Sequence, residues 1–189
     1  MDIFSFVYRG NLTKLQLDRV NPNRKYEGVN EFDARVLEKL PLSDLDPIYI
    51  KEAQKMSSVF ILISAFENMV RDFIKKVLLE SVGEDWWNTK VPEKIRKSVE
   101  IRKKDEQRNR WHNVRGGSEI HYIDFGDLAL VIENNFEHFE MHIPSIDWVR
   151  QIFSSLEKSR NVLMHSGQLS IADIERIGMC VRDWTRQVG

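Results

Sequence analysis

Apolar residues recur at every third or fourth position along most of the chain, which is the spacing of amphipathic helices. The pattern predicts helices over Pro47–Val82, Pro92–Arg108, a segment that starts at Asp124, Pro144–Met164 and a segment that starts at Ser170. Ser170 and Asp173 have the spacing of a capping box. Because strand signals are few after residue 47, the sequence predicts an all-α bundle of four or five helices.

Residues 1–47 lack this periodicity and are predicted to form an N-terminal extension to the helical domain of residues 48–189. Ile3–Tyr8 is followed by a turn signal and predicts a short strand, so the extension is expected to be partly β. Phe32–Leu40 predicts a short helix. Leu12–Leu17 fits either a strand or a helix, and the sequence leaves this choice open.

Two adjacent tryptophans, Trp86 and Trp87, stand in the segment Gly83–Asn88, which is predicted to be a loop. Neighbouring side chains of a helix or strand cannot both face one core direction. We therefore expect one indole ring in the core and the other at its rim.

Two predicted helices carry a charge where an apolar residue is expected. Glu67 interrupts a stripe that includes Phe60, Ile63 and Val70, and Arg160 interrupts the stripe of the Pro144–Met164 helix. A charge on a buried helix face costs free energy unless it has a partner. A single contact between Glu67 and Arg160 explains both interruptions, so the sequence predicts an ion pair between these helices.

The helix that contains Arg160 is predicted to stop at Gly167, and its last turns hold three polar side chains. Asn161 and His165 are four residues apart and are neighbours on the helix surface. Histidine transfers protons near neutral pH, and arginine binds a phosphoryl group through two hydrogen bonds. These residues suit metal-free RNA cleavage, in which a ribose 2'-OH attacks the adjacent phosphate. The alternative is structural, because the helix dipole favours cations at a helix C-terminus.

Basic residues gather at the end of the Pro92–Arg108 helix and in the segment after it. The cluster consists of Lys103, Lys104, Arg108, Arg110 and Arg115, with Trp111 and His112 between them. It is the predicted RNA-backbone surface. The alternative is an exposed helix with Glu93–Lys97 and Glu100–Lys104 pairs. Because the formal net charge is -1, any attraction to RNA must come from such a local patch.

Composition narrows the compartment and the cofactors. The single cysteine, Cys180, leaves no internal disulfide and favours a reducing, cytoplasmic environment. The N-terminus lacks the basic start and cleavage site of a signal peptide, and no apolar run is long enough for a membrane span. Glu137, His138, Glu140 and His142 do not have the spacing of a metal site, so we expect no metal and no cofactor.

The stretch Arg160–His165, which reads Arg-Asn-Val-Leu-Met-His, resembles the Arg-x4-His motif of the HEPN superfamily. Other segments are similar to one branch of that superfamily and occur in order: Phe66–Asn68, Arg71–Ile74, Trp86–Trp87, Arg110–His112 and Tyr122–Leu128. That branch also occurs fused to a PIN-type nuclear mRNA-surveillance endoribonuclease, and in bacterial stand-alone or defence-associated proteins. The resemblance covers residues 48–187 and leaves residues 1–47 outside it.

The resemblance implies a homodimer with a shared, metal-independent ribonuclease site. Its catalytic residues would be Arg160, Asn161 and His165, with Glu67 as their orienting partner. It also implies a toxin or phage-defence protein, whose partners are RNA and a cognate antitoxin or defence-complex protein. Many HEPN proteins bind RNA or assemble complexes without cutting, so a non-catalytic RNA-binding or assembly module is the alternative, and enzymatic activity stays open.

Overall fold

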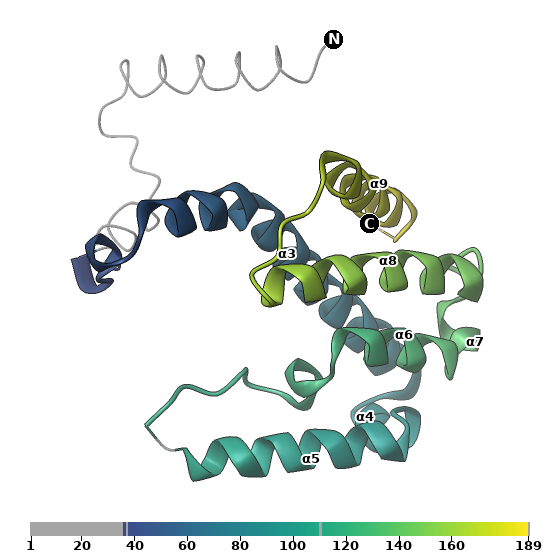
Figure 1. The fold of residues 1–189 in the computed structure, drawn as a ribbon. Helices are drawn as coiled ribbons and strands as arrows, with labels where there is room; N and C mark the ends of the chain where they lie inside the picture. Colours follow the sequence, from purple (N-terminus) through teal and green to yellow (C-terminus); the bar gives the residue numbers. More distant parts are fainter. Residues whose placement is uncertain (1–35, 37, 110, 189) are drawn as a thin grey trace, which may run out of the picture. The chain divides into compact units, whose positions relative to one another are not determined.

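The computed structural model describes residues 36, 38–109 and 111–188, and no strand occurs in this part of the chain (Figure 1). The α-helices are α3 (Pro47–Val82), α4 (Trp86–Lys90), α5 (Glu93–Arg108), α6 (Phe125–Glu133), α7 (Phe136–Phe139), α8 (Ile146–Met164) and α9 (Ile171–Val188). Two short 3-10 helices are η1 (Leu42–Asp44) and η2 (Glu119–Tyr122). The predicted all-α fold is confirmed, with α4 as a short addition and with α6 and α7 in place of the one helix predicted to start at Asp124.

The chain divides into two compact units, residues 1–51 and 52–189, and α3 runs through the boundary. In the first unit, residues 36, 38 and 39 are helical and η1 precedes α3. The predicted strand at Ile3–Tyr8 and the ambiguous segment Leu12–Leu17 lie outside the described residues. The partly β character of the extension and a domain boundary near residue 47 therefore stay predictions.

Helix α3 begins and ends at residues that suit those positions. Pro47 lacks an N–H group in a turn where that group has no helical partner. Gly83, just past the end, has a φ of 88° and donates its N–H to the Leu79 carbonyl at 2.9 Å. The buried apolar stripe of α3 is Val59, Ile63, Phe66, Val70, Ile74, Val77 and Leu78. Placing Phe60 on this stripe was wrong: Phe60 is 50% exposed, because a 3.6-residue period admits either of two adjacent positions and Val59 takes the inner one.

Local hydrogen bonds set the starts of α8 and α9 where the sequence predicts them. The Ser145 side chain accepts a hydrogen bond from the Trp148 N–H at 3.2 Å. Ser170 and Asp173 form the predicted reciprocal box, in which each backbone N–H donates to the other side chain at 3.2 Å. These two boundaries are therefore encoded by a few neighbouring residues.

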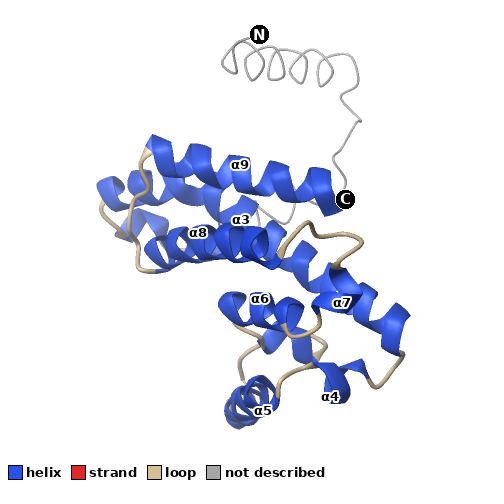
Figure 2. Cartoon of the chain, turned by 90° about the vertical axis from the view of Figure 1, so that its right-hand side faces the viewer, coloured by secondary structure: helices blue, strands red, loops and turns tan. Residues whose placement is uncertain are grey.

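An aromatic core joins helices α3, α6, α8 and α9. The Phe66 ring lies with its centroid 6.2 Å from Phe125, 6.3 Å from Phe153 and 5.8 Å from Trp184, and Phe125 stacks on Phe153 at 5.0 Å. In both views α8 lies between α9 and α6, with α5 beyond α6 (Figure 2). This shared core fixes how α3 and α8 face each other, and hence where Glu67 and Arg160 meet.

The two adjacent tryptophans lie at the start of a helix and not in a loop. Helix α4 begins at Trp86, and Asn88 and Thr89 bond back to Asp85, so the loop predicted over Gly83–Asn88 was wrong in its second half. The prediction of one core ring and one rim ring is confirmed, because Trp86 is buried and Trp87 is half-buried. The Asn88 side chain donates to the Asp85 carboxylate, and the Thr89 hydroxyl donates to the Asp85 backbone carbonyl, so local polar contacts accompany this helix start.

Candidate functional site at the C-terminal end of helix α8

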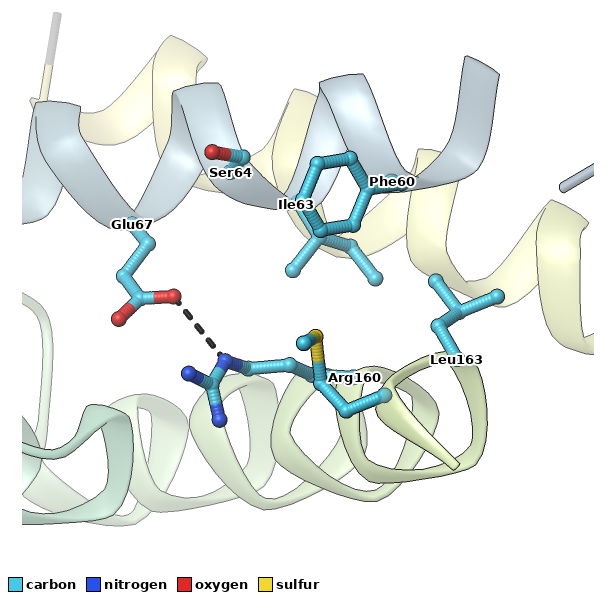
Figure 3. A pocket seen from close by; sticks show the side chains of 7 residues that line it. Phe60, Ile63, Ser64, Glu67, Arg160 and Leu163 are labelled. Atoms are coloured by element: carbon cyan, nitrogen blue, oxygen red, sulfur yellow. Dashed lines mark ion pairs between the residues drawn. The ribbon is translucent and has the colours of Figure 1, made fainter. Parts of the chain in front are cut away.

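Glu67 of α3 and Arg160 of α8 form the ion pair that the sequence predicts. The Arg160 Nε atom lies 3.2 Å from Oε2 of Glu67. Figure 3 shows the guanidinium extending along α8 toward the carboxylate, which points down from α3. The Glu67 side chain is almost fully buried, whereas 38% of the Arg160 side chain is exposed. The contact therefore lies at the edge of the core.

A second guanidinium, which sequence reasoning missed, binds the same carboxylate. Arg71, one helical turn after Glu67, places NH2 2.5 Å from Oε1 of Glu67, and both side chains are about nine-tenths buried. The spacing of four residues on α3 was the available signal, because such pairs are neighbours on a helix. Glu67 thus has an arginine at each oxygen, Arg71 through a hydrogen bond and Arg160 through an ion pair.

The charges of this cluster do not cancel. Arg71 and Arg160 contribute two positive charges and Glu67 one negative charge, which leaves a formal charge of +1. Arg71 is buried, so the extra positive charge is accessible to solvent only at Arg160. Within the described part of the chain, the Arg160 guanidinium contacts Glu67 through Nε, and its NH1 and NH2 groups donate no hydrogen bond there. An arginine in this state is suited to bind an anion.

A pocket of about 160 Å³ opens beside the pair (Figure 3). Its walls are Phe60, Ile63, Ser64, Glu67, Arg160, Leu163 and Met164. Phe60 is 50% exposed and Met164 54% exposed, so the mouth of the pocket has an apolar rim. The arrangement places the Arg160 cation, the Glu67 carboxylate and Ser64 among four apolar side chains, where charged groups interact more strongly than in open water.

Asn161 and His165 are exposed at the end of α8 and are not among the pocket-lining residues. The backbone joins them, because the His165 N–H donates to the Asn161 carbonyl at 3.2 Å. Arg160, Asn161 and His165 therefore share one helix end. Of these three residues, however, only Arg160 is in contact with Glu67 in this chain.

The end of α8 differs in one residue from the prediction. Ser166, and not Gly167, adopts the left-handed conformation, with a φ of 59°. The Ser166 N–H donates to the Leu163 carbonyl at 3.0 Å, and the Gly167 N–H donates to the Val162 carbonyl at 2.8 Å. These two bonds are the Schellman pattern with glycine one position later than usual. A Cβ on Gly167 would lie 2.9 Å from the Val162 carbonyl oxygen, so close approach explains this glycine.

Most described members of the predicted RNA-binding cluster are in ion pairs. Lys103 lies 2.7 Å from Glu119, Arg108 lies 3.1 Å from Asp105 and Arg115 lies 3.0 Å from Glu106. The hydrogen bond from Lys103 lowers the pKa of the Glu119 carboxyl. Lys104 is exposed, and Arg110 lies outside the described residues.

The alternative pattern for the same helix is found in part, since Lys97 lies 2.6 Å from Glu93. The cluster is therefore a mixed-charge surface in the part of it that is described, and its role in RNA binding stays a prediction.

Two further findings concern metals and membranes. In residues 36, 38–109 and 111–188, no group of three or more His, Cys, Asp or Glu side chains is placed to hold a metal ion. Within the same ranges, no helix combines the length and the apolar character that a membrane crossing requires.

A helical bundle in which the penultimate helix, α8, ends in an Arg-x4-His motif, with the arginine ion-paired to a carboxylate of the long helix α3, is the arrangement implied by the HEPN resemblance. Comparison with protein families matches residues 62–189 to the family described as Swt1-like HEPN, and this range is well over half of the chain. The chain belongs to this family, and the match includes Glu67, Arg160, Asn161 and His165. The match concerns the helical domain alone, and a link to a PIN-type nuclease is not shown by it. Comparisons with curated proteins and with solved structures gave no match.

Proposed function

We propose that this chain is a metal-independent endoribonuclease of the toxin or phage-defence type, with a site completed in a homodimer. The observation that supports this most is the surplus cation at the end of α8. Glu67 is already bonded to the buried Arg71, so Arg160 keeps an uncompensated charge on the helix end that also carries the exposed His165. A cation and an imidazole at an accessible position are what cleavage of an RNA phosphodiester without metal requires.

In the proposed reaction the ribose 2'-oxygen attacks phosphorus and the bond from phosphorus to the 5'-oxygen breaks. The 2'-hydroxyl gives its proton to a base, and the leaving 5'-oxygen takes a proton from an acid. A neutral His165 and a protonated His165 from two protomers fill these two roles. The free NH1 and NH2 groups of Arg160 bind the phosphate oxygens as negative charge develops on them.

A homodimer is proposed for two reasons. One protomer supplies a single Arg160 and a single His165 from this motif, whereas the reaction uses a base and an acid. Exposed apolar side chains, including Phe60 and Met164, surround the pocket, and such a surface favours burial against another chain. Size-exclusion chromatography with light scattering tests this arrangement, and a protein that stays monomeric at micromolar concentration contradicts it.

A non-catalytic RNA-binding or assembly module is the second candidate. The surroundings of His165 favour this candidate. A catalytic imidazole is usually oriented by a hydrogen-bond partner, and within the described part of the chain no hydrogen bond is made by the exposed His165 ring. Exposed pairs such as Arg108–Asp105 contribute little to stability and can exchange for phosphate contacts, so the basic cluster serves either candidate. A cognate antitoxin or defence-complex protein remains the proposed protein partner in both cases.

Cleavage assays with His165→Ala and Arg160→Ala proteins test the proposal. Purified proteins are incubated with single-stranded RNA in EDTA, and products are examined for 2',3'-cyclic phosphate ends. The wild type should cut, and each variant should lose about 100-fold or more in rate, as expected when a proton-transfer or charge-stabilising group is removed.

His142→Ala is a matched control, because His142 is exposed and lies outside the Arg160–His165 motif. It should keep wild-type activity. A His165→Ala protein as active as wild type contradicts the nuclease proposal. A wild type that binds RNA and never cuts it supports the non-catalytic module.

A further inference from the structure

One carboxylate, Glu67, serves two arginines whose surroundings differ. Arg71 is buried and Arg160 is partly open to solvent, and each is bonded to a different oxygen of Glu67. We propose that Arg71 is a positioning residue: by holding Oε1 of Glu67 it limits Glu67 to one contact with Arg160 and leaves NH1 and NH2 of Arg160 free for a phosphate. This inference rests on the proposed function for the identity of the anion.

Arg71 is held by backbone as well as by side chains. Its Nε donates to the Ile120 carbonyl at 3.2 Å, and its NH2 also approaches the Ile123 carbonyl at 3.4 Å. Its NH1 donates to Oδ1 of Asn68 at 3.2 Å. With the bond to Glu67, the guanidinium has donors directed at four partners, which fixes its plane. A lysine ammonium at the end of a flexible chain does not reproduce this planar pattern.

The carbonyls that hold Arg71 belong to a segment that is itself held in place. Arg102 of α5 donates to the Tyr122 carbonyl at 2.5 Å and is ion-paired with Asp124. The turn that includes η2 is therefore fixed from α5 on one side and from α3 on the other. Because its other hydrogen bonds fix the Arg71 guanidinium, Arg71 cannot move with the Glu67 carboxylate. Rotation of the carboxylate would therefore break the bond to Oε1, and this bond keeps Oε1 in place.

Removal of Arg71 would change the state of Arg160. The freed Oε1 could then join Oε2 in a two-point contact with the Arg160 guanidinium, the favoured geometry for such pairs. The formal charge of the cluster would fall from +1 to zero, because one of its two cations is lost. Arg160 would still be present, but it would be neutralised and its donors occupied.

The experiment measures how freely Arg160 reacts with phenylglyoxal, which attacks the terminal nitrogens of exposed arginines. The modification rate of Arg160 is followed by peptide mass spectrometry in the full chain, relative to exposed Arg186 on α9. In the Arg71→Met protein the rate should fall by about tenfold, the effect of one additional hydrogen bond between charged groups. In the Glu67→Gln/Arg71→Met protein the rate should return to wild type or above, because the carboxylate is gone.

An Arg160 rate that is unchanged or higher in a folded Arg71→Met protein overturns the proposal, since simple loosening of the structure raises reactivity. Circular dichroism and urea unfolding establish that each variant is folded. If Arg71→Met does not fold, Arg71→Lys is used in its place. The rate at which phenylglyoxal modifies Arg160 should then lie between the wild-type rate and the about tenfold lower rate expected for Arg71→Met. A Lys variant that reacts faster than wild type also overturns the proposal.

RNA affinity in the same variants separates this inference from the proposed function. If RNA is the ligand, affinity should fall in Arg71→Met and recover in the double variant, with Kd values compared at one salt concentration. A wild type that neither binds nor cuts RNA refutes the proposed function. The order of the Arg160 modification rates among the three proteins still tests the role of Arg71, because that measurement uses no RNA.

Discussion

The two arginines that share Glu67 should differ sharply in their contribution to stability. We consider Arg71→Met and Arg160→Met, which remove each charge and keep a long apolar side chain. Arg71 and Glu67 form a buried pair with side chains 11% and 10% exposed, whereas the Arg160 side chain is 38% exposed. If Arg160 serves an anion and not the fold, its loss should leave the protein nearly as stable as wild type.

The magnitudes follow from burial. Breaking a buried ion pair from one side costs about 3 to 5 kcal/mol. We expect the lower end, about 3 kcal/mol, for Arg71→Met, because Arg160 still faces the carboxylate. For Arg160→Met we expect less than about 1 kcal/mol, the usual range for pairs that water reaches. Adding Glu67→Gln to Arg71→Met should recover part of the loss, because it removes the buried negative charge.

Urea unfolding followed by tryptophan fluorescence and by circular dichroism measures these differences, and the fully buried Trp184 reports directly on the core. Arg176→Met, at an exposed i,i+3 pair with Asp173, is the matched surface control. If Arg160→Met costs as much as Arg71→Met, the Arg160–Glu67 contact is a structural ion pair. The interpretation of Arg160 as a surplus cation would then be refuted.

Three further changes test other parts of the structure by thermal and urea unfolding. Ser166→Gly should raise the free energy of unfolding by about 1 kcal/mol, because a glycine has no Cβ to clash at a φ of 59°. Gly167→Ala should lower it, because the added Cβ would lie 2.9 Å from the Val162 carbonyl oxygen. Burial, and then the charge of Asp124, raise the pKa of Asp127. Its charged form is therefore disfavoured in the fold, so Asp127→Asn should stabilise at neutral pH. This advantage should shrink as the pH falls through the raised pKa, and equal gains at acidic and neutral pH would contradict the assignment.

Much of the fold follows from short-range patterns in the sequence. The starts of α8 and α9 depend on hydrogen bonds between residues three apart, such as Ser170 with Asp173, and these can be predicted from the sequence. The contact of Glu67 with Arg160 was predictable because each charge occupies an inward position on its own helix. The position of Phe60 was not, since helical periodicity does not decide between adjacent residues at the margin of a buried face.

The parts of the site that the sequence did not reveal depend on contacts between distant segments. Arg71 is bonded to the carbonyls of Ile120 and Ile123, about fifty residues later. Every residue has a backbone carbonyl, so the sequence does not indicate which carbonyls accept these bonds. A count of basic residues at the end of α5 and just after it likewise does not show that Lys103 is paired with Glu119, sixteen residues away.

Arg160 and Lys103 lead to opposite conclusions, although both are cations paired with a glutamate. Lys103 and Glu119 are a pair of opposite charges with no surplus between them. Glu67 is paired with a second, buried cation as well as with Arg160, so its single negative charge does not neutralise both arginines. The number of cations that share a carboxylate therefore bears on how much charge an arginine keeps for a phosphate, and in the proposed site that second cation is Arg71.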